Sequence, residues 1–281
     1  MDANQTRIGH FQIQEVLRSD GAVTAYRAID TRTDQLIFLY TLDTQLQPEA
    51  DFVQRFVQQA QASLLLRHSH LVTAREVDRI NGLYYLATEP VKGITLARYL
   101  AQHPGPLPLD EAVAIVQQIA EGLDYAHFEG FVHGHLTPEA IWLTPDDEAK
   151  LAGLGLATEA GSHPGHLSLT AFTAPEQLYG VHPPDQRTDV YSLGAIAFTL
   201  LTGKPPFAEE SPDLREQIAS RPPLSAETLN PGLPASVAAV LRFVLAKDPG
   251  SRYLRAGEFA AALRQAPIRA NSAPAAWSAT A

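Results

Sequence analysis

The hydrophobic pattern of the chain changes near residue 90, and this change limits the possible folds more than any other feature. Before it, β-branched and aromatic runs such as Phe11–Leu17, Val23–Ile29 and Leu36–Leu42 are separated by short polar, turn-forming pieces, which is typical of strands. From Thr95 onward, apolar residues mostly recur at the spacing of a helix face. We therefore predict an α+β protein in which a small sheet with one helix precedes a larger helical part.

Several local signals place individual elements. The pair Asn81-Gly82 predicts a tight hairpin turn between two strands. Asp110 is predicted to be the N-cap of a long helix. The segment Asp189–Thr202 is apolar nearly all round and is followed by Gly203, so we expect a helix that is buried at the centre of its lobe.

The length of the chain predicts more than one compact part. Its 281 residues exceed a typical single domain of roughly 100 to 200 residues, so two domains or one two-lobed domain are expected. We place the first lobe at residues 1–90 and the helical lobe at residues 91–266. Residues 267–281 are rich in Ala, Ser and Pro, and we expect a flexible tail or linker there.

Composition narrows the partners and the compartment. The chain carries 31 Asp and Glu against 21 Lys and Arg, and this net charge of -10 disfavours nucleic acid and anionic lipid as partners. The absence of Cys excludes disulfides and thiolate catalysis and fits a reducing compartment. The longest apolar stretch, Leu193–Leu201, is about half of the roughly 20 residues that a membrane span needs. We therefore expect a cytoplasmic protein without a membrane span.

Four segments occur in an order and spacing that resemble one enzyme family. They are Thr173–Glu176 (TAPE), Asp189–Gly194 (DVYSLG), Leu200–Phe207 (LLTGKPPF) and Asp248–Tyr253 (DPGSRY). Over roughly residues 8–265 the chain resembles the eukaryotic-like (Hanks-type) serine/threonine protein kinases of bacteria. This resemblance implies a two-lobed protein kinase-like fold, with a small antiparallel β lobe that contains one main helix and a larger, mostly α-helical lobe.

The resemblance also implies which positions would carry phosphoryl transfer, and here those positions hold other residues. The family uses a glycine-rich loop, a lysine paired with a glutamate, a catalytic aspartate, and an asparagine and an aspartate that bind magnesium. Arg18, Asp20 and Val23 stand where the three glycines are expected. The other replacements are Tyr40 for the lysine, Gln59 for its glutamate, His135 for the catalytic aspartate, Thr137 for the neighbouring lysine, Ala140 for the asparagine and Gly153 for the aspartate that binds magnesium. We therefore predict a pseudokinase that is not an enzyme.

Three large side chains are expected to fill the nucleotide pocket. Residues two apart on a strand share a face, so Phe38 and Tyr40 point to the same side. In the family that side roofs the adenine, and Trp142 matches the floor position. Burying such a ring is favourable by roughly 1.5 to 3 kcal/mol, so we expect a filled slot and no cofactor. The alternative is that these rings are ordinary core residues and that the vestigial hinge, Glu89 and Val91, still admits adenine.

The resemblance assigns structural roles to three further residues. Glu176 and Arg252 match the family's buried ion pair, and removing one partner of such a pair costs about 3 to 5 kcal/mol. Asp189 matches the residue that anchors the catalytic loop. These roles support the fold rather than the chemistry.

Two further groups of polar residues, four histidines and one acidic run, are not predicted to bind metal. His133, His135, His163 and His166 offer imidazoles, which bind zinc or copper, but no fixed ligand spacing supports a site, so we predict no metal. The acidic run Asp146–Glu148 is interpreted as a solvated turn rather than as substitute magnesium ligands.

The loop that ends in TAPE carries several hydroxyl groups. One interpretation is a plain hydroxyl-rich loop, and the other is a segment that a partner kinase phosphorylates to change a docking surface. The candidate phosphorylation sites are Thr158, Ser162, Ser168, Thr170 and Thr173.

Three functions are compatible with these residues. The leading hypothesis is a regulatory or scaffolding module that binds a protein partner, with an active kinase as one candidate, and that has no ATP cofactor. The second is a sensor that binds ATP without turnover. The third is an active kinase with unconventional ligands, in which His135 accepts the proton.

Overall fold

The chain forms two compact units in a computed structural model. The first comprises residues 1–91 with 153–157, and the second comprises residues 92–152 with 158–281. The structure describes residues 7–20, 23–42, 50–156, 169–178 and 184–266. The predicted tail therefore lies outside the described residues. None of the helices in the described ranges has both the length and the apolarity to cross a bilayer.

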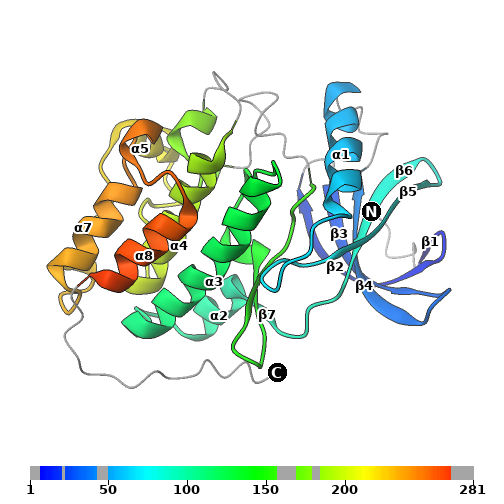
Figure 1. Cartoon of the computed structure of the whole chain (residues 1–281), viewed down its shortest axis with the longest axis horizontal. Helices are drawn as coiled ribbons and strands as arrows, with labels where there is room; N and C mark the ends of the chain where they lie inside the picture. The colour runs from blue at the N-terminus through cyan, green and yellow to red at the C-terminus, as the bar shows by residue number, and fades with distance from the viewer. Residues whose placement is uncertain (1–6, 21–22, 43–49, 157–168, 179–183, 267–281) are drawn as a thin grey trace. The chain divides into compact units, whose positions relative to one another are not determined.

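The first unit is built on an antiparallel sheet of six strands in the order β1-β2-β3-β4-β6-β5 (Figure 1). One helix, α1 (Ala50–Ser63), lies beside this sheet and contacts β5 (Figure 1). The strands are β1 (Arg7–Ile8), β2 (Phe11–Asp20), β3 (Val23–Asp30), β4 (Gln35–Leu42), β5 (Ala74–Ile80) and β6 (Leu83–Thr88). This is the predicted small antiparallel lobe with one main helix.

Side-chain alternation on β4 separates two faces of the sheet. Ile37 and Leu39 belong to a buried cluster that also contains Phe11 and Tyr85. Because side chains alternate along a strand, Phe38 and its neighbour two residues on lie on the opposite face. The cluster around Phe11 and Tyr85 is therefore on one side of β4, and Phe38 and Tyr40 are buried on the other.

The second unit is mostly helical, with one small sheet in the order β7-β8-β9. The three strands are β7 (Ile94–Thr95), β8 (Ile141–Leu143) and β9 (Ala149–Leu151). The α-helices are α2 (Leu96–Gln102), α3 (Leu109–Phe128), α4 (Gln186–Thr202), α5 (Leu214–Ser220), α6 (Ala226–Leu229), α7 (Ala235–Val244) and α8 (Ala256–Gln265). The 3-10 helices are η2 (Pro138–Ala140), η4 (Pro175–Leu178) and η5 (Pro249–Ser251).

Helix α4 is the predicted central helix of this unit. Every residue from Thr188 to Thr202 is buried, and α4 contacts α3, α7 and α8. The helix ends at Gly203, whose φ of 73° is left-handed, as expected for a glycine C-cap. A Cβ at this position would lie 2.7 Å from backbone atoms of Gly105, so close packing as well as conformation requires glycine.

Of two local predictions from the sequence, the structure confirms one and contradicts the other. The Asn81-Gly82 turn is confirmed, because both residues have positive φ, 51° and 86°. The N-cap prediction for Asp110 is wrong, because α3 already begins at Leu109 after Pro108, whose φ is fixed near the helical value. Asp110 instead lies in the first turn, where its carboxylate interacts favourably with the helix dipole.

Candidate functional site

Asp189 organises the loop that contains His133 and Gly134. It lies in the first turn of α4 and is fully buried. Its Oδ2 accepts hydrogen bonds from the backbone N–H of His133 and from Nε2 of His127, and its Oδ1 accepts one from the N–H of Gly134, each at 2.8 Å. Because these donors satisfy a buried carboxylate, they hold the loop backbone to α4.

The hydrogen bonds of His133 fix its tautomer. Its Nε2 lies 3.0 Å from the carbonyl oxygen of Ala152, which can only accept, so Nε2 carries the proton. Its Nδ1 accepts from the backbone N–H of His135 at 3.3 Å and is therefore unprotonated. Both ring nitrogens of this neutral imidazole hold the loop together, so neither is directed at a substrate.

Glu176 and Arg252 form a bidentate ion pair, although they are 76 positions apart. Arg252 Nη1 lies 2.9 Å from Glu176 Oε1, and Nη2 lies 2.8 Å from Oε2. The Arg252 side chain is 0% exposed and also donates to the carbonyl oxygens of Ala246 and Lys247. Thr188 donates a further hydrogen bond to Glu176 Oε1 at 3.0 Å. The pair therefore joins η4, α4 and the segment before α8.

Sequence reasoning missed a link between the TAPE segment and the loop that contains His133 and Gly134. Gln177 donates from Nε2 to the carbonyl oxygen of Gly134 at 2.6 Å, and its Oε1 accepts from the N–H of Ala174 at 3.0 Å. The Gln177 side chain is buried. The polar residue directly after the TAPE letters was the available signal, but its partner is distant in sequence.

Predicted site residues of the first unit lie on β4, on α1 and in segments between the strands and helices. On β4, Phe38 and Tyr40 are 3% and 6% exposed. Gln59 is exposed on α1, and Gly153 is half-buried with a left-handed φ of 92°. Glu89 follows β6 and is joined to Thr73, because its N–H donates to the carbonyl oxygen of Thr73 at 2.9 Å and its Oε1 accepts from the N–H of Thr73 at 3.2 Å.

Four further predicted positions belong to this unit. Val91, the other hinge residue, is half-buried. The side chains of Arg18 and Asp20, at the expected glycine positions, lie outside the described parts of the chain, whereas Val23 begins β3 and is half-buried.

The predicted site residues of the second unit are neighbours in the chain. His135 is half-buried, and Thr137 and Ala140 are buried before and within η2. The carbonyl oxygen of Ala140 accepts from the N–H of Ala152 at 2.8 Å, so backbone contacts fix this turn. Trp142 is half-buried on β8, in register with Lys150 of β9.

Among the candidate phosphorylation sites, the structure describes only Thr170 and Thr173. Thr173 is 4% exposed, and its Oγ1 accepts from the N–H of Thr170 at 3.1 Å. Phosphorylation of Thr173 would therefore require this turn to open. Thr158, Ser162 and Ser168 lie outside the described residues, and so do the metal candidates His163 and His166.

Within the described ranges, the structure brings together a group of side chains of metal-ligand type that sequence reasoning missed. They are His10, Asp30 and Glu76 in the first unit. They come from separate parts of the sheet and have no motif spacing, so only the register of the strands could have revealed them.

Comparisons with known proteins identify the family of this chain. A family model described as the protein kinase domain matches residues 18–260, and the chain therefore belongs to the protein kinase family. The chain is 30% identical over 269 residues to the serine/threonine-protein kinase PknE of Mycobacterium bovis, covering 93% of this chain and 47% of the relative. It is 31% identical over 266 residues to PrkC of Bacillus subtilis, another protein named a serine/threonine-protein kinase, covering 92% of this chain and 40% of the relative.

A solved structure shows the same fold. The kinase domain of Mycobacterium tuberculosis PknI superposes with a TM-score of 0.76 at 26% identity, covering 95% of this chain and 100% of that chain. The present chain spans less than half the length of the curated relatives PknE and PrkC.

These comparisons correct the prediction that the chain is not an enzyme. The family is that of protein kinases, and the curated relatives above are named as serine/threonine-protein kinases. The prediction rested on replaced residues such as Tyr40 and His135, and replacement at family positions does not itself demonstrate that activity is lost. The protein kinase fold and the membership in a bacterial serine/threonine kinase family are both established.

Proposed function

We propose that this protein kinase domain acts as a regulatory or scaffolding module that binds another protein, with an active kinase as the favoured partner. A contrast within the second unit carries the proposal. The hydrogen bonds from the His133 and Gly134 N–H groups to Asp189, and the Glu176–Arg252 ion pair, match contacts that support the fold in this family. By contrast, His135 and Ala140 occupy the positions at which the family handles the reacting proton and the metal. A retained framework with altered phosphate-handling positions supports binding as the main role.

We propose further that nucleotide binding is weak. The support is the identity of three residues: bulky Phe38 and Tyr40 on one face of β4, and Trp142 on β8. In the family the roof and floor of the adenine slot lie at these positions, and rings of this size leave less room for a purine. Tyr40 also lacks the positive charge with which a lysine balances phosphate.

Phosphoryl transfer is a second candidate function, because the named relatives are serine/threonine-protein kinases. In that case we propose that His135 accepts the proton of the acceptor hydroxyl, since it stands at the position of the family's catalytic base. Its side chain is half-buried and its backbone N–H is tied to His133, which fixes the loop geometry.

The acidic charge of -10 and the absence of Cys support two accompanying proposals, that nucleic acid is not a partner and that the chain works in the cytoplasm. We also propose that a partner kinase phosphorylates Thr170, which is half-buried, and, once the turn that buries it has opened, Thr173.

A transfer assay separates the two candidate functions. The chain is incubated with radiolabelled ATP and either Mg²⁺ or Mn²⁺, alone, with a generic protein acceptor, and with an active bacterial serine/threonine kinase. The regulatory proposal predicts that the chain changes the rate at which the added kinase transfers phosphate. Transfer by the chain alone that is abolished by His135→Ala and retained in His103→Ala, a control on α2's C-cap, would instead establish the second candidate.

A further inference from the structure

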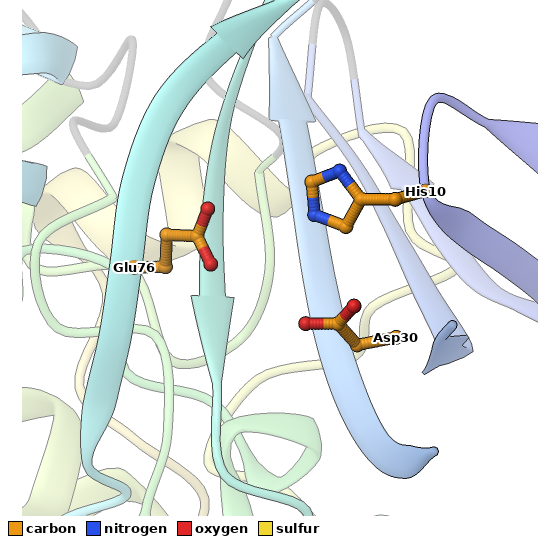
Figure 2. Close-up of side chains that lie close together, drawn as sticks. All are labelled: His10, Asp30 and Glu76. Carbon is orange, nitrogen blue, oxygen red and sulfur yellow. The ribbon is translucent and has the colours of Figure 1, made fainter. Parts of the chain in front are cut away.

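Three side chains of the first unit face a common space. His10 lies between β1 and β2, Asp30 is the last residue of β3, and Glu76 lies on β5. Strand pairing places Phe11 opposite Asp30, so the adjacent His10 comes close to that carboxylate. One ligand atom from each of the three side chains lies within 4.8 Å of the other two, and Figure 2 shows the groups pointing toward one another.

We propose that His10, Asp30 and Glu76 bind a divalent transition-metal cation, with Zn²⁺ as the best fit. One imidazole nitrogen and two carboxylate oxygens are ligand types that zinc accepts, and three protein ligands leave a fourth tetrahedral position for water. Two carboxylates and a neutral imidazole carry a charge of about -2, which a divalent cation balances.

His10 supplies the first independent argument. Its Nε2 is buried, and it has no hydrogen-bond partner among the described residues. Buried polar atoms in folded proteins are nearly always paired, so an orphaned ring nitrogen requires an explanation. The imidazole packs against the ring of Phe11, with centroids 3.9 Å apart, which limits its rotation. A metal ion bound at the cluster would give this nitrogen the partner it lacks.

Arg32 marks the point between the two carboxylates that a cation would occupy. Its Nη2 lies 2.9 Å from Asp30 Oδ2 and 2.5 Å from Glu76 Oε2, so one positively charged nitrogen bridges both groups. The Arg32 side chain is 48% exposed and can turn into solvent without opening the core. The metal and the guanidinium therefore compete for the same two oxygens.

The other carboxylate oxygens are already held by the protein. Asp30 Oδ1 accepts from the backbone N–H of Arg32 at 2.9 Å, and Glu76 Oε1 accepts from the hydroxyl of Tyr85 at 2.6 Å. Tyr85 is 1% exposed, so its hydroxyl is a fixed donor. Outer contacts of this kind orient metal ligands and are worth about 10- to 100-fold in metal affinity.

Calorimetric titration of the metal-free chain with ZnCl₂, and separately with MgCl₂, tests the proposal. We expect one Zn²⁺ per chain bound at this site and much weaker Mg²⁺ binding. His10→Gln and Glu76→Gln should abolish that binding event, and Tyr85→Phe should weaken it about 10- to 100-fold. Arg32→Ala should tighten it, because the competing cation is gone. Matched controls on β5 outside the cluster, Asp78→Asn and Arg75→Ala, should leave the affinity unchanged.

Several results would overturn the proposal. One is the absence of Zn²⁺ binding at millimolar concentration, and another is a binding event that survives His10→Gln. If His10→Gln does not fold, Arg32→Ala decides the matter by itself, since an unchanged affinity in that folded variant would mean that zinc and the guanidinium do not share the carboxylates.

Discussion

Replacing Glu176 with Gln would leave the charge of Arg252 buried without its carboxylate. The Arg252 side chain is 0% exposed, and its remaining acceptors would be the amide oxygen of the new side chain and the carbonyl oxygens of Ala246, Lys247 and Arg187. Carbonyl dipoles satisfy the N–H groups but do not neutralise the charge. The guanidinium cannot lose its proton to escape this cost, because its pKa is too high.

The expected loss follows from that burial. Removing one partner of a buried ion pair costs about 3 to 5 kcal/mol. For a domain of about 150 to 250 residues, each kcal/mol lowers the melting temperature by about 2 to 4 °C, so Glu176→Gln should lower it by roughly 6 to 20 °C. Differential scanning calorimetry measures the shift, and urea unfolding with an unchanged m-value shows that the loss is one of stability.

An exposed pair provides the matched control. Arg242 and Glu227 also form an ion pair, but their side chains are 59% and 40% exposed. Glu227→Gln should therefore change stability by only about 0 to 1 kcal/mol. Combining Glu176→Gln with Arg252→Met should recover part of the loss, because no buried charge remains. Equal shifts for Glu176→Gln and Glu227→Gln would refute the reasoning.

Two smaller predictions concern a helix end and a buried amine. Gly203→Ala should destabilise the chain by more than the roughly 1 kcal/mol that a left-handed φ alone costs, because the new Cβ would also lie 2.7 Å from backbone atoms of Gly105. Gly82→Ala is the control, since Gly82 has a φ of 86° and no atom within 4 Å of the new Cβ, and it should cost only about 1 kcal/mol. Urea unfolding measures both losses. Burial and the charge of Arg252 lower the pKa of Lys247 from 10.5 to about 8. Between these values the unfolded chain binds more protons than the folded chain, so stability from this group rises with pH from about 8 to 10.5. Lys247→Met should flatten that rise across a pH series of unfolding curves, and an unchanged slope would contradict the assignment.

Strong local signals made much of the fold predictable. The all-round apolar run before Gly203 predicted a buried helix, and α4 is buried from Thr188 to Thr202. The Asn81-Gly82 pair predicted a turn because both residues tolerate positive φ. Capping was less predictable, because several residues near a helix start compete for the role, and Pro108 fixed the start of α3 before Asp110.

Contacts between distant residues were predictable only where the family resemblance supplied the partner. Glu176 and Arg252 were paired in this way, and no periodicity relates two residues 76 positions apart. The hydrogen bond from Gln177 to Gly134 and the grouping of His10 with two carboxylates had no such guide. Each depends on which distant segments the fold brings together, and a local sequence pattern does not contain that information.

Calorimetric titration with ATP and Mg²⁺ tests the central proposal, that the residues at the family's nucleotide-binding positions make nucleotide binding weak. The account predicts little or no binding by the unaltered chain and measurable binding by Phe38→Ala combined with Trp142→Leu. Phe128→Ala, which removes a ring that is 86% exposed, should behave like the unaltered chain. Tight ATP binding by the unaltered chain, with a thermal stabilisation approaching the roughly 2.7 kcal/mol expected at 100 times the dissociation constant, would contradict the account.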